Sequence, residues 1–362
     1  MNYMKRLLPI FLCLCLLLVG CKNKNANPTD PVDSSAATTE PTETTTVTQT
    51  PTMTYSHPLT GEPLETPLTT RPTAVIINNI SAAQPLHGIG AADILFEHVA
   101  EGGGSITRML AIFTDLGNAG KVGSIRSART YMINLARSFD APLVHCGGSE
   151  FAYEDFSKTN WNHLDEIYNG KYFFRDSDRK AAGYSSEHTL FANGDKLLQG
   201  LADKGFDMVN EGGTDFGLQF SDDVKLNGKT AKEISIRFYS KSGKRTIMTY
   251  NEKEGMYHGT QKWSNKTTTI ADANLKKDVL FRNVLILDAK TTTDGYRMFS
   301  ELVGEGTGQF ACDGEYVAIK WSRKDTTSPF VFTLEDGTPI TLGIGKTYIA
   351  IRPTQSPAVE FK

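Results

Sequence analysis

Glutamate, arginine and glycine are combined in one short segment in a way that suits anion binding. The segment runs from Glu97 to Arg108 and contains three consecutive glycines. Glycine lets a backbone approach a ligand closely or adopt a positive φ, and such a loop can present amide N–H groups to an anion. No Gly-Lys-Ser/Thr follows, so this is not a Walker phosphate loop. A flexible hairpin loop between two strands is an equally good interpretation.

The strand before the glycines is predicted to carry a mixed face. Side chains of a strand alternate between its two faces, so Glu97 and Glu101 are expected on the same face as Leu95 and Val99. A face that mixes carboxylates with apolar side chains is expected to border a cleft rather than lie in the deep core. The candidate ligand-binding residues of this segment are Glu97, Glu101, Gly102, Gly103 and Arg108.

A second segment, residues 123–130, places two arginines where a strand should turn into a helix. Helix N-termini attract anions through free N–H groups and the macrodipole, and arginine adds bidentate recognition of phosphate or carboxylate. Ser127 is expected to cap a helix over 128–139. Arg126, Ser127 and Arg129 would then form an anion site. The alternative is that Glu97 or Glu101 pairs with these arginines in a purely structural contact.

A third candidate is His188, which is predicted in the first turn of a helix over 186–204. The positive end of the helix dipole would hold this histidine toward its neutral form, which suits general-base work or hydrogen bonding. A purely structural role is the more common outcome for such a histidine. His188 completes the set of candidate ligand-binding residues, and no catalytic residue is assigned.

The cysteines indicate neither a disulfide scaffold nor a metal site. The chain has five cysteines, and no CxxC or zinc-ligand spacing occurs among them. Cys146 and Cys312 are expected to be buried free thiols, although a disulfide between them is the alternative. No metal and no cofactor is therefore predicted.

The N-terminus has the features of a bacterial lipoprotein signal. Residues 1–20 combine Lys5 and Arg6 with a short apolar run that is too short to span a bilayer. The run ends in Leu-Val-Gly before Cys21, which resembles a lipobox, and the resemblance implies a lipid anchor on Cys21. Residues 21–70 are rich in Thr and Pro and are expected to form a disordered tether. We therefore predict a protein anchored at the outer face of the cell membrane in a Gram-positive-type envelope.

The rest of the chain is predicted to form two domains. Over 71–213, short β-rich runs at 74–80, 94–100, 109–114 and 141–146 alternate with helical segments, which indicates an α/β (or α+β) domain with a mixed sheet. Over 214–362, strand-like runs with Asp-Gly turns at 313–314 and 336–337 indicate a mainly β domain. The formal net charge of −3 makes a nucleic-acid partner unexpected.

The order of motifs resembles that of the YerB-type lipoproteins, a two-domain bacterial family without a settled activity. The motifs are RPTAVIINNISAAQPLHGIGAADILFEHVAEGG, ITRMLAIFTD, VGSIRSART, HCGGS, FFRD and EHTLF. A weaker similarity of pattern, in MLAIFTDLGNAGKVGSIRSART, links the chain to LytR-type ligases, which transfer polyprenyl-pyrophosphate-linked glycans. Three hypotheses follow. The first is a binder of an anionic envelope ligand such as a glycan or pyrophosphate, the second an enzyme acting on lipid-linked wall precursors, and the third a protein–protein scaffold with an unidentified partner.

Overall fold

The computed structural model describes residues 55–102, 106–211, 215–239 and 243–362, which belong to one compact unit. The predicted signal peptide, most of the tether and Cys21 lie outside the described residues, as do Gly103 and the predicted domain boundary at 213–214. No helix among the described residues is long and apolar enough to cross a bilayer.

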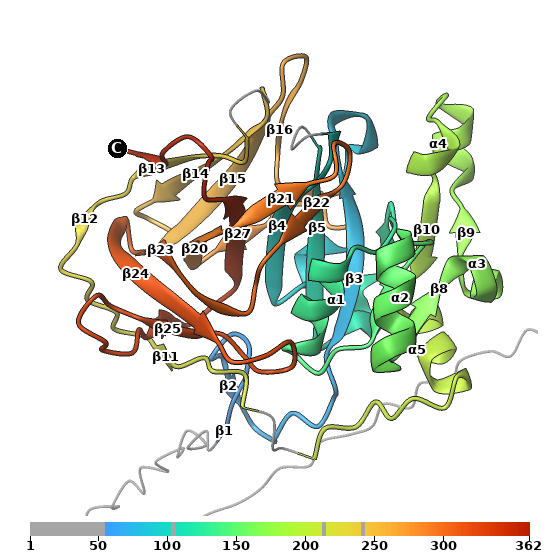
Figure 1. Ribbon diagram of the computed structural model, residues 1–362, viewed down its shortest axis with the longest axis horizontal. Helices are drawn as coiled ribbons and strands as arrows, with labels where there is room; N and C mark the ends of the chain where they lie inside the picture. The colour runs from blue at the N-terminus through green and yellow to red at the C-terminus, as the bar shows by residue number, and fades with distance from the viewer. Residues whose placement is uncertain (1–54, 103–105, 212–214, 240–242) are drawn as a thin grey trace, which may run out of the picture. The chain divides into compact units, whose positions relative to one another are not determined.

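One eleven-stranded mixed sheet runs through both predicted domains (Figure 1). Its order is β12-β24-β23-β20-β27-β4-β5-β3-β7-β8, with β25 beside β24. At the centre β27 lies parallel to both β20 and β4 and so joins the C-terminal strands to the N-terminal ones. The strands are β3 (Thr73–Asn79), β4 (Ile94–Glu101), β5 (Ile106–Phe113), β7 (Leu143–His145), β8 (His163–Asp165), β12 (Lys229–Thr230), β20 (Asn283–Ala289), β23 (Gly304–Cys312), β24 (Glu315–Arg323), β25 (Val331–Thr333) and β27 (Thr347–Pro353).

Smaller sheets complete the β structure. A six-stranded sheet holds β13 (Glu233–Arg237), β14 (Arg245–Asn251), β15 (Met256–Lys262), β16 (Thr267–Thr269), β19 (Leu280–Phe281) and β28 (Glu360–Phe361), and a three-stranded sheet holds β6 (Lys121–Gly123), β9 (Phe174–Arg175) and β10 (Leu190–Asn193). Two-stranded pairs are formed by β1 (Tyr55–Ser56) with β2 (Pro63–Leu64), β11 (Phe220–Ser221) with β26 (Leu342–Gly343), β17 (Ala271–Asp272) with β18 (Lys277–Asp278), and β21 (Thr291–Thr293) with β22 (Met298–Ser300).

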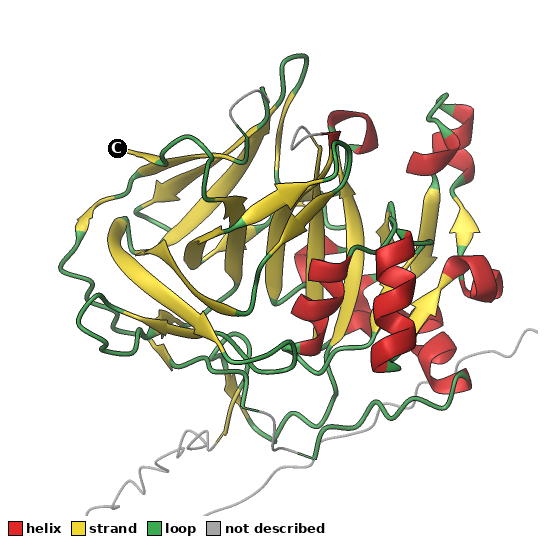
Figure 2. Ribbon diagram, in the orientation of Figure 1, coloured by secondary structure: helices red, strands yellow, loops and turns green. Residues whose placement is uncertain are grey.

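The helices gather around the N-terminal part of the sheet, whereas the C-terminal part is strands and loops (Figure 2). They are α1 (Thr130–Arg137), α2 (Glu150–Thr159), α3 (Glu166–Asn169), α4 (Ser177–Ala181) and α5 (Gly194–Asp203), with 3₁₀ turns that include η6 (Ser186–His188). This distribution confirms the predicted fold class, a mixed-sheet N-terminal region followed by a mainly β C-terminal region.

In the N-terminal strands, apolar side chains point alternately to the two faces of the sheet, which explains why both faces are buried. Val75, Ile77 and Leu95 contribute to one apolar core. Their neighbours Ile76 and Phe96 point to the other face and join a second core together with side chains of α1. The sheet therefore divides the interior into two layers, and a polar side chain in these strands must find its partners inside the protein.

Two predicted helices differ from the structure. The helix expected over 128–139 begins only at Thr130, with Arg129 as an N-cap that makes no side-chain capping bond, so the prediction of Ser127 as cap is wrong. The chain stays extended there because the N–H of Ala128 donates to the carbonyl of Gly147 at 2.9 Å. The helix expected over 186–204 is interrupted by β10, since residues 191–193 pair with β6. Tertiary strand pairing overrides local helix propensity at this point.

The start of α5 depends on a glycine that touches another backbone. A Cβ atom added at Gly194 would lie 1.8 Å from the carbonyl oxygen of Leu116, whereas one added at Gly170 would meet nothing within 4 Å. We expect Gly194→Ala to lower the free energy of unfolding by about 1–3 kcal/mol, because α5 must shift to relieve the overlap. Gly170→Ala, whose backbone is already helical, should change it by less than about 1 kcal/mol. Urea unfolding of both variants tests the difference, and equal stabilities would contradict it.

Candidate functional site

A bulge in β4 decides which glutamate meets the arginines. The pairing of β4 with β5 shifts register between Val99 and Glu101, so that Glu101 lies opposite Ile106. An extra residue in a strand reverses the alternation beyond it. Glu101 therefore turns to the face that carries Arg108, while Glu97 stays on the opposite face. The prediction that both glutamates share one face is wrong for this reason.

Glu101 holds two guanidinium groups in a buried cluster. Its Oε1 accepts a hydrogen bond from Nη2 of Arg108 at 2.8 Å and is also in contact with Nη2 of Arg129. Nη1 of Arg108 donates to the carbonyl of Ser127 at 2.6 Å, and Nη1 of Arg129 donates to the carbonyl of Ala128 at 2.7 Å. The structural pairing considered from sequence is thus present for Glu101. Glu97 takes no part in it.

Arg126 completes what we call the arginine cluster, namely Arg108, Arg126 and Arg129. Its Nη2 lies 3.0 Å from Oε2 of Glu187, whose other oxygen is 3.6 Å from Nε2 of His188. The side chain of Arg126 is 23% exposed and that of Glu187 is 51% exposed, whereas those of Arg108 and Arg129 are buried. Arg126 is therefore the guanidinium of the cluster that solvent reaches most readily.

His188 lies at the end of a 3₁₀ turn, not in the first turn of a helix as predicted. Its Nδ1 is 3.0 Å from Nδ2 of Asn78, and since an amide nitrogen only donates, Nδ1 is the acceptor. Burial lowers the pKa of His188, and Glu187 acts in the opposite direction. The imidazole is thus neutral near pH 7. Its hydrogen bond with Asn78 fixes the residue next to Glu187 against β3.

The electrostatics of the cluster favour an added negative charge. Three arginines face two carboxylates, Glu101 and Glu187. Burial lowers the pKa of Arg108 to about 10, and the nearby charge of Arg126 acts in the same direction. Arg108 nevertheless remains charged at neutral pH. The Nε atoms of Arg126 and Arg129 are buried and have no hydrogen-bond partner among the described residues. An anion placed beside Arg126 would offset this excess positive charge.

The remaining candidate ligand-binding residues of the two segments act through their main chain rather than their side chains. Ser127 offers its carbonyl to Arg108. Gly102 follows Glu101 with a φ of 63°, a conformation that favours glycine, so the chain can turn away directly after the bulge. Gly103 lies outside the described residues.

Glu97 belongs to a separate and fully buried network. It is 0% exposed, where the sequence predicted the border of a cleft. Its Oε1 accepts from Asn79 at 3.0 Å and from Thr107 at 2.8 Å, and it contacts Nζ of Lys244. Its Oε2 accepts from the hydroxyls of Thr246 and Tyr348. The carboxylate therefore links β4 to β14 and β27, and neither oxygen is open to a ligand.

Within the described parts of the chain, no group of three or more His, Cys, Asp or Glu side chains could hold a metal ion. Cys146 and Cys312 are both free, as expected, and only Cys312 is fully buried. Burial raises the pKa of each thiol to about 12. Neither thiol is therefore activated for nucleophilic chemistry.

Sequence reasoning missed partners that come from distant segments. Asn78 and Glu187 carry no local signal for their contacts with His188 and Arg126. Arg297 lies far along the chain, yet its backbone bridges to that of Glu101, and its Nη1 is 3.0 Å from Glu150. The two glutamates of the strand over 94–101 were the one available signal for such partners, because a carboxylate that becomes buried requires a buried cation.

The Glu97 network gives a prediction for stability. Burial lowers the pKa of Lys244, so its ammonium depends on the contact with Glu97. We expect Glu97→Gln to lower the free energy of unfolding by about 3–5 kcal/mol, because that ammonium loses its counter-charge. Glu335→Gln, at an exposed position, should change it by less than about 0.5 kcal/mol. Adding Lys244→Met to Glu97→Gln should recover part of the loss. Chemical denaturation measures all three variants, and a loss below 1 kcal/mol for Glu97→Gln alone would contradict the account.

Comparison with known proteins places these residues in a family. Residues 59–207 match the model described as the protein of unknown function (DUF3048) N-terminal domain, and residues 234–349 match the corresponding C-terminal domain. "Putative lipoprotein YerB" of Bacillus subtilis (strain 168) is 29% identical over 343 residues, which is 93% of this chain and 92% of the relative.

The fold is similar to that of a solved structure as well. The crystal structure of YerB protein from Bacillus subtilis matches with a TM-score of 0.72 and 26% sequence identity, over 84% of this chain and 99% of the other. These similarities confirm the resemblance to the YerB-type lipoproteins seen in the sequence motifs. The chain belongs to the DUF3048 family.

Proposed function

We propose that this protein is a lipid-anchored component of the outer face of the cell membrane that binds an anionic cell-envelope ligand at the arginine cluster. The anchor is proposed from the lipobox-like sequence before Cys21 and from the lipoprotein name of its Bacillus relative. The ligand site is proposed from the arginines around Glu101. The observation that carries it is the excess of guanidinium over carboxylate, three against two, beside an exposed edge.

The two buried arginines serve mainly to shape the site. Arg108 and Arg129 are both fixed on Glu101 and on main-chain carbonyls, so they cannot turn toward a ligand without breaking buried contacts. Among the described residues Arg126 has one ion pair, and its partner Glu187 is half exposed. Exchanging that exposed pair for a ligand phosphate or carboxylate costs little, because exposed ion pairs contribute only about 0–1 kcal/mol. Arg126 is thus the residue proposed to grip the ligand.

The proposal does not extend to phosphoryl transfer. That alternative needs Glu97 or Glu101 as a base or metal ligand. Glu97 is fully buried with both oxygens bonded, and Glu101 is occupied by two arginines. The geometry therefore favours recognition over catalysis at this site.

Binding to the cell wall tests the role of Arg126. We expect Arg126→Ala in the full chain to weaken binding to Gram-positive wall fragments about ten- to a hundredfold with an unchanged melting temperature, because a charge-assisted contact of about 1.5–3 kcal/mol is lost. Fragments stripped of phosphodiester-linked polymers should not bind the unaltered protein. Lys290→Gln, which removes an exposed lysine elsewhere, is the matched control.

Two outcomes would contradict the proposal. One is equal binding by the unaltered protein and Arg126→Ala. The other is a large loss of stability in Arg126→Ala, which would assign this arginine to a structural ion pair. Binding that resists removal of the phosphate polymers would instead favour a protein or neutral-glycan partner.

The anchor has its own test. In a Gram-positive host fed an alkyne-labelled fatty acid, the full chain should carry the label and fractionate with the membrane. Cys21→Ser should be unlabelled and released, since lipid chains provide the stable anchoring. Cys146→Ser should behave like the unaltered protein, because Cys146 is a free thiol of the folded body. Label retained in Cys21→Ser would contradict the assignment of the anchor to Cys21.

A further inference from the structure

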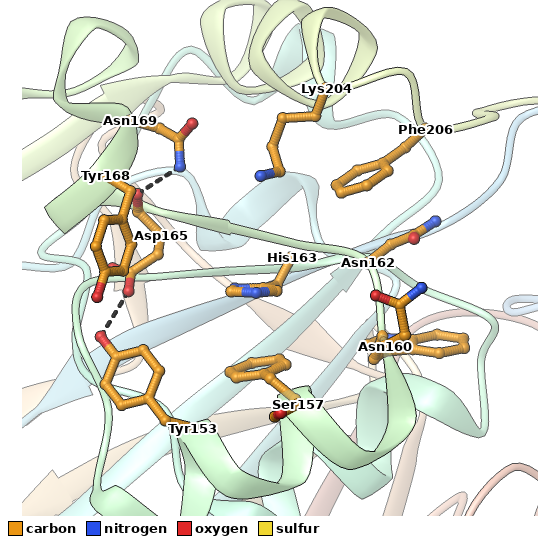
Figure 3. A pocket seen from close by; sticks show the side chains of 12 residues that line it. Tyr153, Ser157, Asn160, Asn162, His163, Asp165, Tyr168, Asn169, Lys204 and Phe206 are labelled. Carbon is orange, nitrogen blue, oxygen red and sulfur yellow. Dashed lines mark hydrogen bonds between the residues drawn. The ribbon is translucent and has the colours of Figure 1, made fainter.

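A cavity lies apart from the residues of the arginine cluster. It has a volume of about 490 Å³ and is bordered by α2, β8, α3 and the end of α5 (Figure 3). Such a volume is within the range of small-molecule sites in proteins. We call it the His163 pocket, because the ring of His163 lies in its middle in Figure 3, with the side chain of Lys204 pointing toward it from above.

A hydrogen-bonded pair of histidines fixes the tautomer of His163. Nδ1 of His145 lies 2.8 Å from the carbonyl oxygen of Gly147, which can only accept, so Nδ1 of His145 carries a proton. Burial lowers the pKa of His145, and its Nε2 is therefore an acceptor. Nδ1 of His163, 2.9 Å away, must donate to it. Burial also lowers the pKa of His163, to about 4, so its Nε2 bears a lone pair at neutral pH.

That lone pair has no partner among the residues that the structure describes. The ring is held in place by stacking on Phe156, with 3.9 Å between ring centroids. Asp165, which borders the same pocket, is itself only an acceptor, from the N–H of Gly147 at 2.8 Å and from the hydroxyl of Tyr153 at 2.7 Å, so it offers no proton to that lone pair. The pocket thus presents an oriented hydrogen-bond acceptor, Nε2 of His163, to which a ligand hydroxyl could donate.

The rest of the lining supplies a cation, amides and an aromatic ring. Lys204 makes no ion pair with any described residue, and its Nζ lies 5.5 Å from the centroid of the Phe206 ring. Asn160 and Asn162 border the same space. Tyr168 is 74% exposed at the edge of the pocket, an unusual position for so large a ring. Aromatic rings at polar sites offer apolar contact surface together with hydrogen bonding.

We propose that the His163 pocket binds an acidic sugar. A ring hydroxyl would donate to Nε2 of His163, the apolar face of the sugar would lie on Tyr168, and the carboxylate would lie beside Lys204. A single lysine suits one carboxylate better than a polyphosphate, for which clustered arginines or a glycine-rich loop would be expected. The inference does not depend on the function proposed for the arginine cluster, because it uses none of the same residues.

Paired probes test the proposal on the full chain. N-Acetylmuramic acid carries a carboxylate that N-acetylglucosamine lacks, and isothermal titration should show saturable binding of the acid that is roughly three- to tenfold tighter. Lys204→Met should remove that difference, since it takes away the cation. Tyr168→Ala should weaken both sugars. Both side chains are exposed, so neither change should affect folding.

Nitrogen NMR supplies a readout that a structural role would not produce. In the free protein Nε2 of His163 should resonate as an unprotonated nitrogen, and it should shift on titration with N-acetylmuramic acid. Arg126→Ala should leave this binding unchanged, which separates the pocket from the arginine cluster. The absence of saturable binding of N-acetylmuramic acid, or equal affinities in the unaltered protein, Lys204→Met and Tyr168→Ala, would overturn the proposal.

Discussion

The arginine cluster depends on one buried carboxylate, that of Glu101. Two guanidinium groups share this carboxylate inside the protein, and each also donates to a main-chain carbonyl near the start of α1. A buried charge without a counter-charge would be strongly destabilising, so the contact fixes the end of β4 against the segment before the helix. The same contact positions Arg126, because Arg126 belongs to the segment before α1. Its side chain is partly exposed to solvent there.

The bulge in β4 allows one strand to serve two purposes. Before it, Glu97 faces the C-terminal strands and forms a polar network with Lys244, Thr246 and Tyr348. After it, Glu101 faces α1 and the arginines. The parallel pairing of β27 with β4 places the C-terminal residues where Glu97 can reach them. The two carboxylates thus stabilise opposite faces of one sheet.

The sequence predicted those strands and helices that their own local pattern of apolar and polar residues determines. The strands near 74–80, 94–100 and 109–114 occur close to their predicted positions. A structural contact of Glu101 with Arg129 was also foreseen as an alternative, whereas its contact with Arg108 was not. Nothing in the sequence marks the bulge, since one extra residue leaves the apolar pattern nearly unchanged. The strand over 190–193 was not predicted, because it forms by pairing with β6, which is distant in the sequence. Lys244, Arg297 and the His145–His163 pair depend on tertiary proximity in the same way.

A crystal structure with a short glycerol-phosphate oligomer would show whether the arginine cluster is an anion site at which Arg126 binds the phosphate. We expect a phosphate beside the Arg126 guanidinium, with the Glu187 side chain displaced and the contacts of Glu101 to Arg108 and Arg129 intact. An unchanged Arg126–Glu187 pair, with no phosphate at the cluster under saturating oligomer, would contradict this proposal.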